Sequence, residues 1–157
     1  MIHASVQELK SHLQPGLRLL GLDVGTKTIG MAISDGALIV AAGIDTIRRT
    51  KFTKDAVALG EIIGERNVGG IVIGLPVSMD GTEGAACQSV RQFGTNLDEK
   101  LDLHIAFWDE RLSTSAVERF LIDEADMSRK RRSEVVDKMA AAYILQGALD
   151  ALNMSAV

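Results

Sequence analysis

Residues 17–35 read LRLLGLDVGTKTIGMAISD, and this stretch decides the fold. The apolar run that ends at Gly25 predicts a strand, and the alternation from Thr28 onward predicts a second strand. A turn separates the two, and Asp35 marks the next turn, before a third strand over 37–47. The stretch therefore predicts a three-stranded antiparallel meander.

The hydrophobic period changes after the meander, because apolar residues recur at helical spacing or in short runs that suit buried parallel strands. We expect strands over 69–76 and 103–110, and helices over 51–67, about 83–100, 114–125 (capped by Ser113) and about 133–153. This order predicts an α/β fold: a mixed five-stranded sheet, the meander plus parallel strands, with helices on both faces. Residues 17–153 are expected to form a single domain, and 1–16 a short amphipathic N-terminal extension.

The composition is that of an ordinary globular protein, since 157 residues suffice for one core. A single cysteine, Cys87, favours a reducing compartment. The chain starts without a signal-peptide pattern, and its apolar runs fall short of the roughly 18 residues that a membrane span needs. We therefore expect a cytoplasmic protein with no membrane partner.

The net charge of −4 argues against nucleic acid as a partner, but phosphates respond to local charge within about a Debye length. Basic residues gather in two runs, and either run alone reads equally well as a solvated face. The runs are Arg48, Arg49, Lys51 and Lys54, and Arg129, Lys130, Arg131 and Arg132. Charge therefore permits a nucleic-acid partner without deciding for one.

Asp23 occupies a position that packing alone would not choose, because it follows three leucines inside the first strand. A charge inside a buried strand costs several kcal/mol, roughly, unless it is paired or bound to a cation. The alternative is an aspartate that accepts hydrogen bonds from turn amides, but the turn begins only after Asp23. We interpret Asp23 as a site residue.

Asp109 and Glu110 end the strand over 103–110, at the sheet edge where open α/β sheets keep their ligands. Alternation along a strand puts the two side chains on opposite faces, so only one can face Asp23. The alternative is a plain strand-to-loop transition with exposed acids. The residues alone leave the choice between Asp109 and Glu110 open.

Asp137 is predicted to border the buried stripe of the last helix, one turn before Ala140 and Ala141. The alternative is an aspartate paired with Lys138 or Arg131 at the helix start, and Glu134 could take either role. The predicted stripe is Val136, Met139, Ala140, Tyr143, Ile144, Gly147 and Ala148.

Three carboxylates from distant segments suit a hard, oxygen-seeking ion, so we expect Mg²⁺ or Mn²⁺. His3, His12 and His104 show no ligand spacing with one another, which argues against zinc.

Four blocks of this sequence resemble the signature blocks of the YqgF/RuvX family, in the same order and over about residues 18 to 150. They are GLDVGTKTIGMAISD (21–35), IVIGLPVSMDGTEG (71–84), WDERLSTSAVERFL (108–121) and VVDKMAAAYILQGAL (135–149).

The resemblance implies an RNase H-like nuclease domain related to RuvC-type Holliday junction resolvases, whose members are also described as maturing the 5′ end of pre-16S rRNA. It implies that Asp23, Glu110 and Asp137 are the catalytic, metal-binding acids. RuvC-type enzymes carry a glutamate at the end of the fourth strand, where this chain has Gly74, so the Asp-Glu-Arg acid would have to substitute. Thr28 stands where the family often has arginine.

Several residues are candidates for holding the phosphates of the substrate: Lys27, Arg111, Thr82, Arg129, Lys130, Arg131 and Arg132. Thr82 is also predicted to cap the helix that follows, whose amides would then face a phosphate. Alternatively, Lys27 is a solvated lysine in a turn, and Arg111 holds Asp109 or a helix end in place.

Two other functions remain open at this point. Asp-x-Gly in a hairpin also opens the phosphate loops of actin-like ATPases, although those folds need two such domains. A non-catalytic nucleic-acid-binding or ribosome-assembly factor would keep the fold without the chemistry. The sequence also does not decide whether the substrate is RNA or branched DNA, or whether the protein is a monomer or a homodimer.

Overall fold

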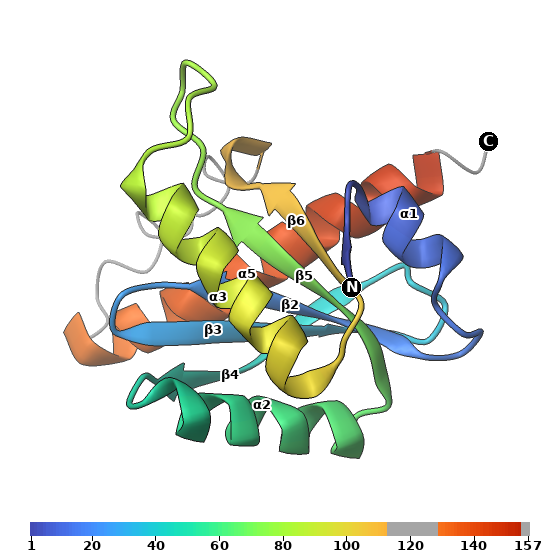
Figure 1. Cartoon of the computed structure of the whole chain (residues 1–157), viewed down its shortest axis with the longest axis horizontal. Helices are drawn as coiled ribbons and strands as arrows, with labels where there is room; N and C mark the ends of the chain where they lie inside the picture. The colour runs from blue at the N-terminus through green and yellow to red at the C-terminus, as the bar shows by residue number, and fades with distance from the viewer. Residues whose placement is uncertain (113–128, 155–157) are drawn as a thin grey trace.

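The computed structural model describes residues 1–112 and 129–154, with only the backbone described at 112 and 129–135. A mixed sheet runs through the molecule, and helices cover both of its faces (Figure 1). The strands are β1 (Ile2–His3), β2 (Arg18–Val24), β3 (Thr28–Ser34), β4 (Ala41–Arg48), β5 (Val68–Leu75) and β6 (Ile105–Asp109). The helices are α1 (Val6–Ser11), α2 (Phe52–Glu65), α3 (Ala85–Leu101) and α5 (Arg129–Met154), with a short 3₁₀ turn, η1 (Glu110–Leu112).

The five predicted strands are confirmed, and the sheet gains a sixth, β1, in the order β1-β6-β5-β2-β3-β4. Strands β2, β3 and β4 form the antiparallel meander, while β5 pairs parallel to β2 and to β6. The parallel strands β2, β5 and β6 therefore end at one common edge of the sheet.

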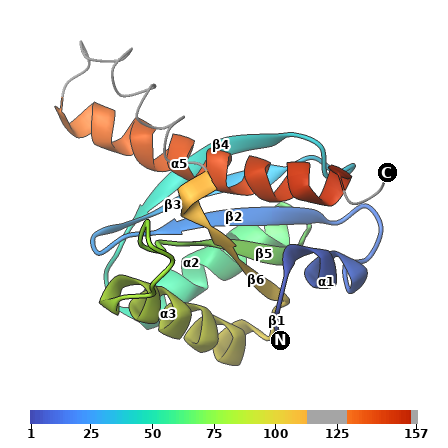
Figure 2. The ribbon, with the colours of Figure 1, turned by 90° about the horizontal axis from the view of Figure 1, so that it is seen from above.

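Helices lie on both faces of the sheet (Figure 2), and each face has its own layer of apolar side chains. Helices α2 and α3 cover one face, over alternate residues such as Leu20 and Leu22 of β2. Helix α5 crosses the other face together with α1, over Leu19, Val72 and Ala106. Side chains of one strand thus divide between the two layers by strict alternation. Among the described helices, none combines the length and apolar character that a bilayer span requires.

The N-terminal segment is part of the sheet rather than a loose lead-in, which the sequence did not indicate. Its strand β1 pairs parallel with the edge strand β6, and Leu9 of α1 is fully buried. It also brings the histidines together: the His3 ring centroid lies 4.5 Å from that of His12 and 5.2 Å from that of His104. Two residues of backbone pairing are too short to produce a recognisable strand pattern.

Two element boundaries differ from the prediction for local reasons. Strand β4 begins at Ala41 rather than at residue 37, because the Asp35 carboxylate accepts hydrogen bonds from the Ile39 and Val40 amides and Leu38 takes a positive φ of 60°. Helix α5 begins at Arg129 rather than near 133, since lysine and arginine are good helix formers. The helix predicted over 114–125 and its cap, Ser113, lie outside the described residues.

Candidate active site

Asp23 and Glu110 meet at the common edge where the parallel strands end. Asp23 is the next-to-last residue of β2, and Glu110 opens η1 directly after β6. A hydrogen bond joins their side chains. Both line a hollow of about 290 Å³, whose other walls are the β2–β3 turn and the first turns of α3.

Burial is the largest influence on the ionisation of this pair. It raises the pKa of Glu110 to about 8, with further contributions from the charge of Asp23 and from the hydrogen bond between the two. Burial and the charge of Asp137 raise the pKa of Asp23, while the hydrogen bond from Glu110 opposes that rise. Partial burial and the close approach of the two carboxyls therefore both disfavour the state in which Asp23 and Glu110 are ionised together.

Gly74 makes room for the Glu110 side chain. A Cβ added at Gly74 would lie 2.7 Å from Oε1 of Glu110 and 2.5 Å from Cδ1 of Ile144. Because β5 lies between β2 and β6 in the sheet, a side chain at this position would separate the two acids. The glycine is thus a condition for the Asp23–Glu110 contact.

Asp109 points to the opposite face of the sheet, which resolves the choice that the sequence left open. Its carboxylate accepts hydrogen bonds from Nε and Nη2 of Arg111 and from the Arg111 amide. Together the two line a different hollow, beside Phe107 on the α3 face. The Arg111 hydrogen bonds hold the pKa of Asp109 below its usual range. Strand alternation at β6 therefore directs Glu110, not Asp109, toward Asp23.

Asp137 reaches the same edge from α5. Its carboxylate accepts a 2.9 Å hydrogen bond from Oγ1 of Thr28, the first residue of β3. The backbone of α5 rests directly on Gly30, where an added Cβ would lie 2.7 Å from the carbonyl carbon of Asp137. Since Gly30 is the cross-strand partner of Asp23, this packing places Asp137 beside the acid pair.

The predicted stripe of α5 is partly wrong, because the helix is rotated relative to it. Met139, Ala140 and Tyr143, which were assigned to the stripe, are only half-buried. Asp137 precedes the first fully buried residue by one turn and so lies in line with the stripe rather than at its border. Small strand residues let α5 approach on that side. The buried stripe is Ala141, Ile144, Leu145, Ala148, Leu149 and Leu152.

The donor set is compatible with a hard divalent ion, because Asp23, Glu110 and Asp137 offer only carboxylate oxygens. The pKa values of Asp23 and Glu110 are both raised, so ionising both of these half-buried acids is unfavourable unless a positive charge lies close by. Among the side chains of residues 1–111 and 136–154, however, no three of His, Cys, Asp or Glu are grouped closely enough to hold a metal. Two acids are paired, and the third is held by Thr28 next to them.

The predicted phosphate-binding residues do not all lie at the hollow. Lys27 is exposed in the β2–β3 turn, one side of which lines the hollow. Arg111 is locked on Asp109 at the neighbouring hollow. The side chains of Arg129, Lys130, Arg131 and Arg132 lie outside the described residues.

Thr82 does not cap α3, so that prediction is wrong. The helix begins at Ala85 behind Gly84, which has no side chain to cap it. The amide and hydroxyl of Thr82 instead donate to Oδ1 of Asp80. This aspartate competes for Thr82 because asparagine and aspartate side chains readily close turns with residues two positions on.

Arg49 belongs to the hollow, although sequence reasoning noted it only as part of a basic run. It follows β4 and lines the hollow with Asp23 and Glu110. Nothing local distinguishes it from Arg48, which lines a separate hollow beside Lys138. The path of the chain after β4 places Arg49, and not Arg48, at the hollow that Asp23 and Glu110 line.

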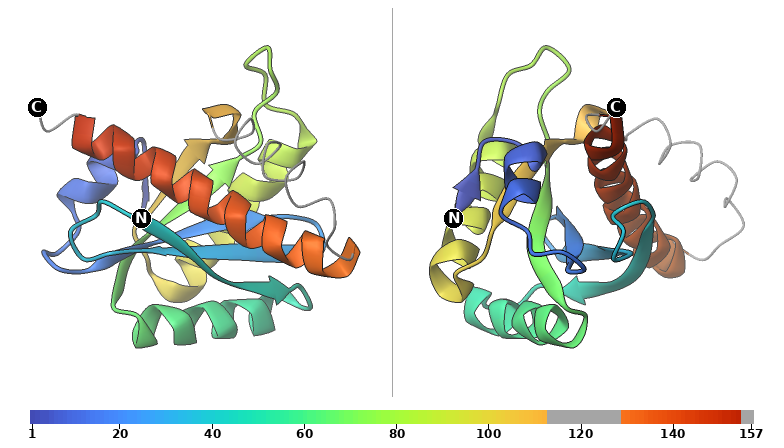
Figure 3. Two further views of the ribbon diagram at one scale, coloured as in Figure 1. Left: turned by 180° about the vertical axis from the view of Figure 1, so that it is seen from behind. Right: turned by 90° about the vertical axis from the view of Figure 1, so that its right-hand side faces the viewer.

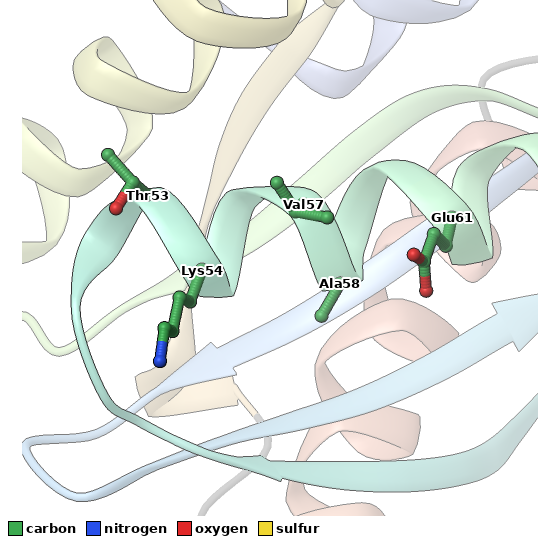
Figure 4. Close-up of a pocket in the computed structure, with 5 residues that line it drawn as sticks. All are labelled: Thr53, Lys54, Val57, Ala58 and Glu61. Carbon is green, nitrogen blue, oxygen red and sulfur yellow. The ribbon is translucent and has the colours of Figure 1, made fainter.

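A further hollow, of about 460 Å³, follows the outer surface of α2 and contains none of the predicted site residues. In Figure 4 Lys54, Ala58 and Glu61 extend from one side of the helix, with Thr53 and Val57 above them. Figure 3 shows α2 at the side of the molecule remote from α5, which carries Asp137. We therefore take the hollow lined by Asp23 and Glu110, and not the one along α2, as the candidate active site.

Two solved structures of resolvases are similar to this chain over most of its length. The structure of Thermus thermophilus RuvC in complex with a Holliday junction substrate matches with a TM-score of 0.53 at 10% identity, over 86% of this chain and 94% of that one. The fowlpox virus resolvase in complex with Holliday junction DNA matches with a TM-score of 0.52 at 10% identity, over 87% and 99%. These likenesses show an RNase H-like fold.

Sequence relatives are far closer. A protein of Paramagnetospirillum magneticum named "Putative pre-16S rRNA nuclease" is 63% identical over 143 residues, which are 91% of this chain and 92% of its own length. A protein of the same name from Rhodospirillum centenum is 60% identical over 154 residues, 95% of this chain and 81% of its own. The family described as "RuvX: Holliday junction resolvase" matches residues 17–151. With its acids at the edge of an RNase H-like sheet, the chain belongs to the RuvX family.

Proposed function

We propose that this chain is a nuclease that hydrolyses phosphodiester bonds in the maturation of the 5′ end of pre-16S rRNA, in the cytoplasm. The observation that carries the proposal is the half-buried, hydrogen-bonded pair of Asp23 and Glu110 at the edge of the sheet, with Asp137 beside it. The substrate follows from the names of relatives that are 60% identical or more. Residues 17–153 would form the one nuclease domain.

Asp23, Glu110 and Asp137 would hold Mg²⁺ or Mn²⁺, which suit oxygen ligands. When bound, such ions supply an activated water and stabilise the leaving oxygen of an in-line displacement. Glu110, whose pKa is raised, would bind such an ion in its ionised form, and Thr28 would keep the Asp137 carboxylate oriented.

Basic side chains around the hollow would hold the phosphate backbone of the substrate. Lys27 lies in the turn at its rim. Arg111 would act from the neighbouring hollow, and the α3 end beside Thr82 would contribute backbone amides. The run Arg129, Lys130, Arg131 and Arg132 opens the helix that carries Asp137, so these cations would add salt-sensitive contacts to the backbone.

The test is cleavage of a labelled precursor rRNA fragment and of a four-way DNA junction, side by side, in Mg²⁺ and in Mn²⁺. We expect the wild type to cut the RNA, and Asp23→Asn and Asp137→Asn to lose at least about 100-fold in rate, since even outer partners of a metal site cost 10- to 100-fold. Asp102→Asn is the matched control, because Asp102 is exposed beyond the far end of α3 and asparagine tolerates its positive φ.

Equal cleavage by the wild type and both acid variants would show that the acids are not catalytic. Cleavage of the junction alone would reassign the protein to branched DNA, the substrate that the family description names.

A further inference from the structure

Arg49 is held in place at the hollow that the acid pair lines, by one backbone contact and two side-chain contacts. Its amide donates to the Lys27 carbonyl at 2.8 Å, and Nη1 donates to the Gly25 carbonyl at 2.6 Å. The guanidinium lies 5.3 Å from the centroid of the Phe93 ring. The β2–β3 turn and helix α3 thus fix the same side chain from opposite sides.

Phe93 is itself a rigid support. It is only 4% exposed, and the Phe52 ring packs edge-on against it with centroids 5.7 Å apart. A planar guanidinium stacked on such a ring loses little further freedom when it binds a ligand. The conformation of Arg49 is therefore prepared before any substrate arrives.

Arg49 carries a charge that no acid neutralises within the described part of the chain. Arg91 and Arg111 are bound to Glu83 and Asp109, whereas Arg49 has a carbonyl and a ring for partners. A guanidinium has five N–H donors, and the bond to Gly25 uses one of them. The rest of the fork is available at the hollow that Asp23 and Glu110 line.

We propose that Arg49 binds a backbone phosphate of the substrate strand in this hollow and so positions the neighbouring phosphodiester over Asp23 and Glu110. The inference rests on the proposed nuclease function of those acids. A fork of N–H donors matches two phosphate oxygens, so the contact fixes orientation as well as charge. Arg49 is thus a substrate-binding residue, and the acids do the chemistry.

The test measures RNA binding and cleavage separately. Binding of a labelled RNA oligonucleotide is followed by fluorescence anisotropy at several salt concentrations, with wild type, Arg49→Gln, Arg49→Lys and Arg66→Gln. Glutamine at 49 keeps an amide to donate to Gly25 but removes the charge. Arg66→Gln makes the same charge change at the exposed end of α2, away from the hollow.

We expect Arg49→Gln to weaken binding about tenfold or more and to lower the salt slope by about one, as the loss of one phosphate contact predicts. Arg49→Lys should recover the slope but not the full affinity, because it lacks the fork. Arg66→Gln should match the wild type, and melting curves should show that Arg49→Gln is folded. The KM for cleavage should rise more than kcat falls.

A salt slope and affinity for Arg49→Gln equal to those of Arg66→Gln would overturn the proposal. The proposal would also be overturned if RNA affinity fell only in step with the melting temperature and Arg49→Lys bound RNA as weakly as Arg49→Gln. That pattern would indicate that Arg49 has a structural role. A wild type that binds RNA with the expected dependence on Arg49 but never cleaves it would instead contradict the nuclease function and leave the phosphate contact standing.

Discussion

Gly74 and Glu110 form a complementary pair. Gly74 near the end of β5 has no side chain, and Glu110, directly after β6, occupies the space beside Asp23. The acid is thus delivered from a 3₁₀ turn, where its backbone is set by the end of β6. One missing side chain explains how the Asp-Glu-Arg block can supply the second acid.

Glu110→Gln should lower cleavage by at least about 100-fold, because it removes the partner of Asp23 from the site. Asp109→Asn should stay within about tenfold of the wild type, since Asp109 faces Arg111 on the other side of the sheet. Rates on one RNA substrate at saturating Mn²⁺ compare the two. A larger loss with Asp109→Asn than with Glu110→Gln would reverse the assignment.

Gly74→Ala should inactivate the protein while leaving it folded, because the added methyl group forces the Glu110 carboxylate and Ile144 apart. Overpacking of this kind costs about 1–3 kcal/mol of stability. Gly64→Ala in α2, where an added Cβ meets nothing, is the matched control and should stabilise by about 0.5–1 kcal/mol. Cleavage assays and thermal melts of both variants test this prediction. Full activity of Gly74→Ala would show that the Glu110 side chain can take another position without loss of function.

At the scale of elements, α5 lies on a row of glycines across the meander. Added Cβ atoms at Gly21, Gly30 and Gly43 would each meet α5, at Leu145, Asp137 and Lys138. The glycines let the helix approach the three strands closely, which is how Asp137 comes to lie beside Asp23. Small residues in strands are visible in the sequence, but which helix uses them is not.

The loop between β3 and β4 supplies a test of pH dependence. The amides of Ile39 and Val40 hold the pKa of Asp35 below its ordinary value. A lowered pKa contributes stability that is present above the ordinary value of about 3.9 and is lost as the pH falls from there through the lowered pKa of the folded state. The melting temperature of Asp35→Ala should therefore lie below that of the wild type near neutral pH and converge on it in acid. A constant difference from about pH 6 to pH 3 would contradict this role.

At the scale of the whole molecule, the N-terminal segment completes both the sheet and the core. Leu9 is 0% exposed and packs against Leu19 of β2 and over Gly70 of β5. Leu9→Ala should cost about 2–5 kcal/mol in the free energy of unfolding. Met79→Ala, at a side chain that is 89% exposed, should change it by less than about 0.5 kcal/mol. Denaturant unfolding of the two variants measures the difference. Equal midpoints for Leu9→Ala and Met79→Ala would mean that the N-terminal segment does not unfold together with the core.

His104, which contacts His3 of the same segment, supplies a second test of pH dependence. Burial, and then the His3 ring, hold the pKa of His104 below its ordinary value, with the N-terminal ammonium and His12 acting in the same sense and Asp102 opposing them. Because the folded pKa is lowered, this stability is present above about pH 6.5 and is lost as the pH falls.

His104→Asn, which keeps a polar atom near Nδ1 for His3, should therefore flatten the fall in melting temperature between about pH 7 and pH 5. His12→Asn should have the smaller effect, since His12 is the more exposed ring of the cluster. An unchanged pH profile for His104→Asn would show that the cluster does not titrate with unfolding.

The sequence by itself determined the meander, the buried strand β5, the helix α2 and the position of Asp23 inside a strand. These features follow from alternation, turn residues and a charge in an apolar run, which act over a few neighbouring residues. Tertiary structure decided the rest: that Glu110 rather than Asp109 faces Asp23, that β1 joins the sheet, and that Arg49 lies at the hollow. Each of these depends on which segments meet after long separations in the chain, and the packing of α5, β5 and β6 sets those meetings.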